Sequence, residues 1–275
     1  MTPKTKGRFI LLPMLLCVCL TFCSCGSNES TEKPSAVSSD TAAKDSYLGS
    51  NSKVKLQITG SDEITYTYNL HDGYETFPLT SGSGSYTVGV FENIEGTSYS
   101  TLFTQAIDVT IQDEFGPYLY ANQYVNFSAD SKVISKAMEL SASANDDLEV
   151  IENVYNYIIT NFTYDYDKAA SVQSGYLPNV DEVLASQTGI CFDYAAVMAS
   201  MLRCERIPTR LEVGYMGDVY HAWISTYLDE QGWVDNVIEF DGNDWKLMDP
   251  TFASTSSDPK DFLTQTDEYI TKYVY

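Results

Sequence analysis

Residues 188–195 read Thr-Gly-Ile-Cys-Phe-Asp-Tyr-Ala, and they predict that a helix begins at Cys191. Gly189 allows a tight entry, the small and apolar residues up to Leu202 continue the helix, and Ile207-Pro208 ends it. At a helix N-terminus, the unpaired backbone N–H groups and the positive end of the dipole favour a thiolate over a thiol. The same N–H groups can stabilise an oxyanion on a bound acyl group. Cys191 is therefore the predicted nucleophile.

Two later segments supply the partners that a sulfur nucleophile needs. His-Ala-Trp stands at 221–223 and Asp-Pro-Thr at 249–251, in a chain with only 2 histidines. We expect His221 to take and return a proton and Asp249 to orient its ring. Taken singly, they could be a small buried thiol, a strand histidine and a turn residue before proline. Their occurrence together favours a Cys–His–Asp triad, which needs no metal or cofactor, and we expect none.

The patterns around the triad predict an α+β fold. Apolar residues repeat at helical spacing from Ile151 to Phe162 behind a capping signal at Asp146, and Asn179 can cap a further short helix. A helix is also expected over 130–144. After the Cys191 helix, alternation with period two predicts strands over 211–215, 221–228, 233–240 and 245–249, the last two joined by a turn at 241–243. One helix packed on an antiparallel sheet is an α+β arrangement.

Residues 53–127 have an all-β pattern typical of a β-sandwich-like region. Strands are expected near 54–58, 64–70, 86–94 and 99–111, with a tight hairpin turn at Asp72-Gly73 after the second. The 21 tyrosines of the chain are compatible with binding of cell-wall carbohydrate, but equally with an aromatic core. The predicted organisation is a signal peptide over 1–25, a flexible linker over 26–52, a β-rich domain over 53–127 and the triad domain over 128–275.

The first 25 residues have the features of an export signal. Lys4, Lys6 and Arg8 precede an apolar run over 9–22 that is too short to span a bilayer comfortably. The run ends at Phe22-Cys-Ser-Cys25-Gly, which resembles the lipobox of bacterial lipoproteins, with Phe22 in place of the usual Leu. We therefore expect lipidation at Cys25 and a location outside the cytoplasm, anchored to the membrane by lipid. A plain secretory signal and a retained anchor helix are the alternatives.

The net charge argues against one class of partner, and the positions of the cysteines indicate whether a disulfide can form. The chain carries 38 acidic and 16 basic residues, a net charge of -22, which makes binding to nucleic acid unfavourable. Beyond the signal, the cysteines are Cys191 and Cys204. They are expected at the two ends of one helix, roughly 20 Å apart at 1.5 Å per residue, so no disulfide should join them.

Residues from about 150 to 252 resemble the transglutaminase-like superfamily, which is related to the papain-like thiol enzymes. Five matching motifs carry this resemblance: Gly189-x-Cys191-x-x-Tyr194-Ala195, Arg203-x-x-x-Ile207-Pro208-x-Arg210, Gly214-Tyr215, His221-Ala222-Trp223, and Trp245-x-x-x-Asp249-Pro250-Thr251. The resemblance implies a Cys–His–Asp triad at Cys191, His221 and Asp249. Arg206 departs from the family, which usually has Gly there, in a position that often needs positive φ, so a different helix end is expected here. Gln187 is a weak candidate for the oxyanion-hole side chain.

The family implies acyl transfer through a thioester, on a peptide or protein substrate at the cell surface. The acceptor determines the product: water gives a peptidase or deamidase, and an amine gives a transglutaminase. No residue specifies the acceptor, although the extracytoplasmic setting favours water. The competing hypothesis is a catalytically inactive surface protein that binds a partner and keeps this fold as a scaffold.

Overall fold

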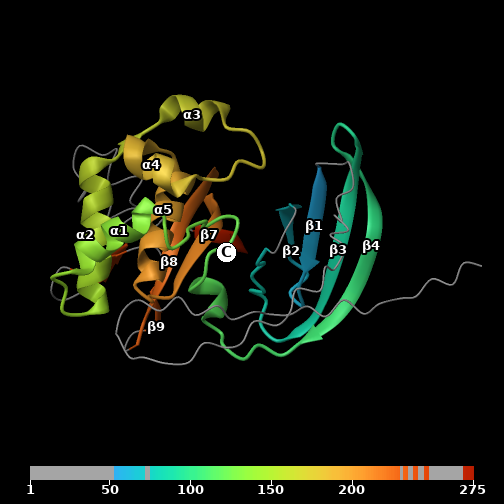
Figure 1. Ribbon diagram of the computed structural model, residues 1–275, viewed down its shortest axis with the longest axis horizontal. Helices are drawn as coiled ribbons and strands as arrows, with labels where there is room; N and C mark the ends of the chain where they lie inside the picture. Colours follow the sequence, from blue (N-terminus) through green and yellow to red (C-terminus); the bar gives the residue numbers. More distant parts are fainter. Residues whose placement is uncertain (1–52, 72–74, 230–231, 235–237, 241–244, 248–268) are drawn as a thin grey trace, which may run out of the picture. The chain divides into compact units, whose positions relative to one another are not determined.

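The computed structural model describes residues 53–71, 75–229, 232–234, 238–240, 245–247 and 269–275. Two four-stranded antiparallel sheets dominate these residues, one before and one after a group of helices (Figure 1). The predicted α+β class is confirmed. The predicted turn at 72–73, Asp249, the signal segment and Cys25 lie outside the described residues. Within the described part of the chain, no helix is long and apolar enough to cross a membrane.

The N-terminal sheet has the strand order β2-β1-β3-β4. Its strands are β1 (Val54–Thr59), β2 (Thr65–Leu70), β3 (Gly84–Glu95) and β4 (Ser98–Val109). The turn between β3 and β4 uses Gly96 at a φ of 56°, as the Glu95-Gly96 pair suggests. One expectation was wrong: no hairpin joins β2 to β3, because β3 pairs with β1 and not with β2.

Tyrosine side chains fill the core beneath this sheet. Tyr66, Tyr68 and Tyr86 are buried, so their rings are not available to stack on a sugar. Tyr275 stacks on Tyr124 with ring centroids 3.7 Å apart and meets Tyr66 edge-on at 5.5 Å. The edge-to-face contact with Tyr66 is an arrangement that aromatic quadrupoles favour. The aromatic-core interpretation of the tyrosine content is therefore confirmed for these buried residues.

Two helices of the region after the first sheet, α2 and α4, begin where the capping signals predict. Its helices are α1 (Lys132–Ser141), α2 (Asp147–Asn161), α3 (Tyr166–Ser171), α4 (Val180–Ser186) and α5 (Cys191–Cys204), preceded by a 3-10 turn over Gly116–Tyr118. Asp146 accepts from the backbone N–H of Glu149 at 2.9 Å, and Asn179 accepts from that of Glu182 at 3.3 Å. Each contact satisfies an N–H group that the first turn of a helix leaves without a partner.

The second large sheet has the order β12-β7-β8-β9. Its strands are β7 (Thr209–Met216), β8 (Val219–Leu228), β9 (Gly232–Val234) and β12 (Tyr269–Val274). A separate two-stranded sheet pairs β10 (Ile238–Phe240) with β11 (Trp245–Leu247), and two short parallel strands pair β5 (Thr163–Tyr164) with β6 (Thr188–Gly189). The expected hairpin is thus confirmed at 238–240 and 245–247. The single strand expected over 233–240 is two strands, since its first part pairs with β8 and its last part with β11.

Helix α5 is the centre of the core. It packs against α1, α2 and α4 and against β7 and β8 (Figure 1). Apart from its two ends, nearly every side chain from Asp193 to Arg203 is buried. Because this helix is apolar on all sides, it can exist only inside a domain that surrounds it. The position of Cys191 is consequently determined by the packing of the whole helix.

Candidate functional site

Cys191 is the first residue of α5 and is partly buried. Ile190, which precedes it, has extended backbone geometry, with a φ of -105° and a ψ of 175°. The first-turn N–H groups of such a helix have no partner within the helix. The thiol therefore stands where the positive end of the helix dipole favours a negative charge, as predicted.

The backbone just before Cys191 is held by a buried carboxylate. Asp193 is 0% exposed, and its Oδ2 accepts from the backbone N–H of Ile190 at 2.8 Å. A side chain at position 189 would clash with Asp193, because a Cβ built on Gly189 would lie 2.7 Å from the Asp193 Cβ. Gly189 is therefore required for close approach and not for a positive φ.

His221 lies on β8, the strand of the second sheet that packs against α5. Its side chain is buried at 5% exposure, and its ring lies near that of Trp223, with centroids 6.3 Å apart and planes 24° apart. Opposite His221 on β7 is Gly214. A Cβ on Gly214 would lie 2.0 Å from the backbone oxygen of Ile270, so only glycine lets β12 pair with β7 beside His221. The sheet thus holds the histidine on a rigid strand whose neighbours are closely packed.

The other predicted site residues have different outcomes. Asp249 and Cys25 lie outside the described residues, and their roles stay predictions. Gln187 is the left-handed C-cap of α4, with a φ of 51°, and its side-chain amide donates to the Tyr157 hydroxyl at 3.4 Å. Its proposed oxyanion role also stays a prediction.

Arg206 has the backbone geometry expected of the glycine that it replaces. Its φ is 68°, and the N–H groups of Arg206 and Ile207 donate to the carbonyls of Arg203 and Leu202 at 3.1 and 3.0 Å. This pair of bonds is a Schellman motif, which normally favours glycine at this position. The exposed guanidinium lies 5.6 Å from the ring centroid of Tyr120. The helix therefore ends as the resemblance implies, despite the substitution.

Cys204 is at the opposite end of α5 from Cys191, and no disulfide joins the two, as expected. The thiol of Cys204 donates to the backbone oxygen of Met201 at 3.1 Å. This sulfur is bonded within its own helix end and lacks the placement at the positive end of the dipole that Cys191 has.

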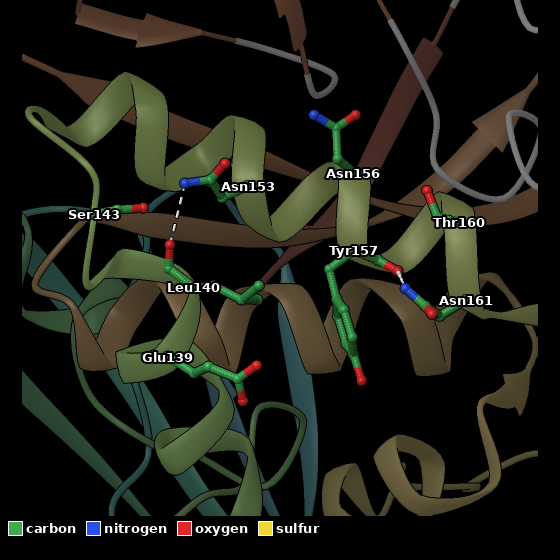
Figure 2. A pocket seen from close by; sticks show the side chains of 8 residues that line it. All are labelled: Glu139, Leu140, Ser143, Asn153, Asn156, Tyr157, Thr160 and Asn161. Carbon is green, nitrogen blue, oxygen red and sulfur yellow. Dashed lines mark hydrogen bonds between the residues drawn. The ribbon is translucent and has the colours of Figure 1, made fainter.

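A pocket of about 400 Å³ opens between α1 and α2 (Figure 2). Neither Cys191 nor His221 lines it. Two of its amides already donate within the fold: Asn153 to the backbone oxygen of Leu140 at 3.1 Å, and Asn161 to that of Tyr157 at 2.7 Å. The first contact joins α2 to α1 and the second lies within α2, so the pocket is a feature of helix packing and is separate from the candidate site. No group of residues suited to a metal ion occurs in the described ranges.

Three comparisons with known proteins bear on the site. Residues 134–236 match the family model of the transglutaminase-like superfamily. The curated UPF0252 protein MJ1282 of Methanocaldococcus jannaschii is 26% identical over 106 residues. That match covers 34% of this chain and 30% of the relative, so the chain spans less than a third of the relative's length.

Among solved structures, similarity extends to a candidate cysteine protease of Cytophaga hutchinsonii, with a TM-score of 0.44, 16% identity and coverage of 82% of this chain and 77% of that one. The periplasmic domain of TgpA from Pseudomonas aeruginosa, bound to ethylmercury, has a TM-score of 0.40 and 14% identity over 78% of this chain and 93% of that one. A red sea bream transglutaminase has a TM-score of 0.33 and 14% identity over 74% and 46%. These TM-scores are all below 0.5, so the structural similarity assigns no activity to this chain. The family match covers Cys191 and His221, and residues 134–236 are therefore similar to the core of the transglutaminase-like superfamily.

Proposed function

We propose that this protein is an extracytoplasmic thiol enzyme that transfers acyl groups from amide bonds of peptides or proteins. The observation that carries the proposal is the placement of Cys191 as the first residue of α5, on a helix that packs against the strand of the buried His221. This arrangement supports a thiolate at the helix N-terminus and a histidine on a rigid neighbouring strand. Both are what nucleophilic catalysis by sulfur requires.

The proposed reaction has two steps. The Cys191 sulfur attacks the amide carbonyl, and the backbone N–H groups at the start of α5 stabilise the resulting oxyanion. His221 protonates the departing amine, which leaves a thioester on Cys191. Water or a primary amine then attacks the thioester, His221 takes its proton, and the thiolate is restored. In this proposal Asp249 orients the His221 ring. Water yields an acid and an amine yields a new amide.

Peptide mixtures incubated with the wild-type protein and with Cys191→Ala test this proposal by mass spectrometry, with and without an added primary amine. We expect new peptide masses with the wild type only, in one of three forms. Cleaved peptides indicate a peptidase, a gain of about 1 Da indicates deamidation, and addition of the amine indicates a transglutaminase. Products formed equally by Cys191→Ala, or by neither protein, would contradict an enzymatic role and favour an inactive scaffold.

We further propose that the protein is anchored outside the cytoplasm by lipid on Cys25. The support is the order of basic residues, apolar run and Cys25-Gly in the sequence. Lipid chains on Cys25 bind the membrane because each buried CH₂ group contributes about 0.8 kcal/mol. Cys25→Ala is therefore expected to move most of the protein from the membrane fraction to the soluble fraction, measured by immunoblot after fractionation. Cys204→Ala is the matched control, and retention of Cys25→Ala in the membrane would instead indicate a retained anchor helix.

A further inference from the structure

A buried ion pair lies under the start of the nucleophile helix. The fully buried Asp193 carboxylate accepts three hydrogen bonds. Besides the backbone N–H of Ile190, its donors are Lys168 Nζ at 2.6 Å and the Tyr176 hydroxyl at 2.5 Å. Lys168 also donates to the Tyr176 oxygen at 2.7 Å, so the three side chains form a closed triangle. Because Asp193 is two residues after Cys191, this triangle belongs to the first turn of α5.

The chain brings Lys168 to this place through short backbone contacts. β5 pairs with β6, and the N–H of Asp165 donates to the backbone oxygen of Gly189 at 2.8 Å. Asp165 then caps α3 by accepting from the backbone N–H of Lys168 at 2.8 Å. The lysine is therefore fixed relative to the turn that precedes Cys191, and only 27% of its side chain is exposed.

The charge of Asp193 presents a problem for a thiolate at Cys191. A carboxylate in the first turn stabilises the helix, but it also repels a second negative charge in the same turn. Within a partly buried site, repulsion between unit charges several ångströms apart raises the pKa of a thiol by about one unit or more. A cation paired with Asp193 removes this repulsion and leaves the carboxylate free to hold the Ile190 N–H.

We propose that Lys168 is a positioning residue of the candidate active site: it neutralises Asp193, so that Asp193 can hold the turn at Ile190–Cys191 without opposing a thiolate on Cys191. This inference rests on the proposed function of Cys191 and names a residue that acts on it through Asp193.

The protonation states of Lys168 and Tyr176 agree with the proposed role of Lys168. Burial disfavours the charged form of Lys168, but its hydrogen bonds to Asp193 and Tyr176 outweigh burial, and its pKa is raised above the ordinary value. Burial and the nearby Asp193 raise the pKa of Tyr176, which therefore stays neutral. The triangle thus has one positive and one negative charge at neutral pH. Other titratable groups of the described residues, on or beside α3 and the elements that pack against α5, include Asp165, Asp167, Tyr124, Tyr155, Tyr157, Tyr164, Tyr166, Tyr194, Asp181, Glu182, Tyr220 and His221. Among them, histidine is the type that titrates between pH 5 and 8.

The test is the pH dependence of alkylation of Cys191 by iodoacetamide in the full chain, followed by mass spectrometry of the Cys191 peptide. We expect Lys168→Met to raise the apparent pKa of this thiol by about one unit and to slow alkylation at pH 6 by about tenfold. Lys168→Arg should restore most of the wild-type profile. The double variant Lys168→Met/Asp193→Asn, which leaves no uncompensated charge, should also return the apparent pKa to within a few tenths of a unit of wild type.

Two controls distinguish a specific change in the pKa of the Cys191 thiol from a general loss of structure. Lys136→Met removes a lysine of similar exposure, 25%, which pairs with Glu139 at 2.6 Å on α1, and it should leave the profile unchanged. Alkylation of Cys204, measured in the same samples, should be the same in all variants. If Lys168→Met does not fold, Lys168→Gln takes its place, since it removes the same charge but keeps a hydrogen-bond donor. It should raise the apparent pKa of the Cys191 thiol in the same direction, and an unchanged profile would overturn the role of Lys168.

An unchanged Cys191 profile in Lys168→Met, or a double variant shifted as far as the single one, would overturn the role of Lys168. If the proposed function of Cys191 is wrong, the same experiment gives a different result. In that case wild-type Cys191 would titrate near the ordinary thiol value of about 8.5, whatever the difference between wild type and Lys168→Met.

Discussion

His221→Ala is expected to slow alkylation of Cys191 at pH 7 by about 10- to 30-fold. A protonated imidazole beside the sulfur favours the thiolate, whereas a thiol with an ordinary pKa of about 8.5 is only about 3% ionised at this pH. Acyl transfer should fall further, by about 10²–10⁴-fold, because the variant also loses the group that carries the proton in both steps. Rates of iodoacetamide labelling and of product formation, measured on the same preparation, check the two effects separately.

The other histidine of the chain provides the matched control. His71 is exposed on the surface, and its Nδ1 lies 2.8 Å from Glu75. His71→Ala should leave both rates within about twofold of wild type. Equal labelling rates for wild type and His221→Ala would mean that His221 does not activate Cys191, even if Cys191 itself proved reactive.

Arg203→Met is expected to lower the free energy of unfolding by about 3–5 kcal/mol. The Arg203 side chain is 1% exposed and donates to three backbone oxygens: to Thr209 at 2.9 Å, to Tyr120 at 2.8 Å and to Tyr275 at 2.6 Å. Burial lowers its pKa to about 9, so the guanidinium is still charged at neutral pH. Methionine fills similar space but removes the Arg203 donor from all three carbonyls, of which that of Tyr275 keeps a hydrogen bond from the Leu211 N–H at 2.9 Å. A buried carbonyl left without a donor costs about 1–3 kcal/mol. The removed cost of burying the cation offsets part of this loss.

Urea denaturation measures this loss as a lower midpoint at a similar slope. Arg206→Met is the matched control, since it removes the same charge from an exposed position three residues away. Its midpoint should stay close to that of wild type. If both variants unfolded at the same urea concentration, the three carbonyls would not depend on Arg203.

The features that could be predicted from the sequence are local or periodic. The caps at Asp146 and Asn179 and the start of α5 at Cys191 each depend on a few neighbouring residues. Hydrogen bonds between a cap side chain and the next turn form within three residues, so a short motif contains the information needed. The strands β7 and β8 were predictable for a similar reason, since their alternation covers enough residues to be distinct.

The errors concern pairing between distant segments. The 64–70 strand was correct, but the expected hairpin after it was not, because β3 pairs with β1. The segment 233–240 was expected as one strand and is divided between β8 and β11. Strand propensity shows that a segment is a strand but does not show which strand it pairs with. The pairing depends on how the rest of the chain packs against each face of the sheet.

By itself, the sequence determined where α5 begins and so placed Cys191 at its N-terminus, because the start of a helix depends on a few neighbouring residues. It also identified His221 by type and by its place on a strand. Only the tertiary structure decided what surrounds that helix end. Lys168 and Asp193 are 25 positions apart and meet because two-residue strands at 163–164 and 188–189 pair, a contact too short to leave a periodic signal. The buried charge of Asp193, and the need for Lys168 beside it, follow from packing that no local pattern contains.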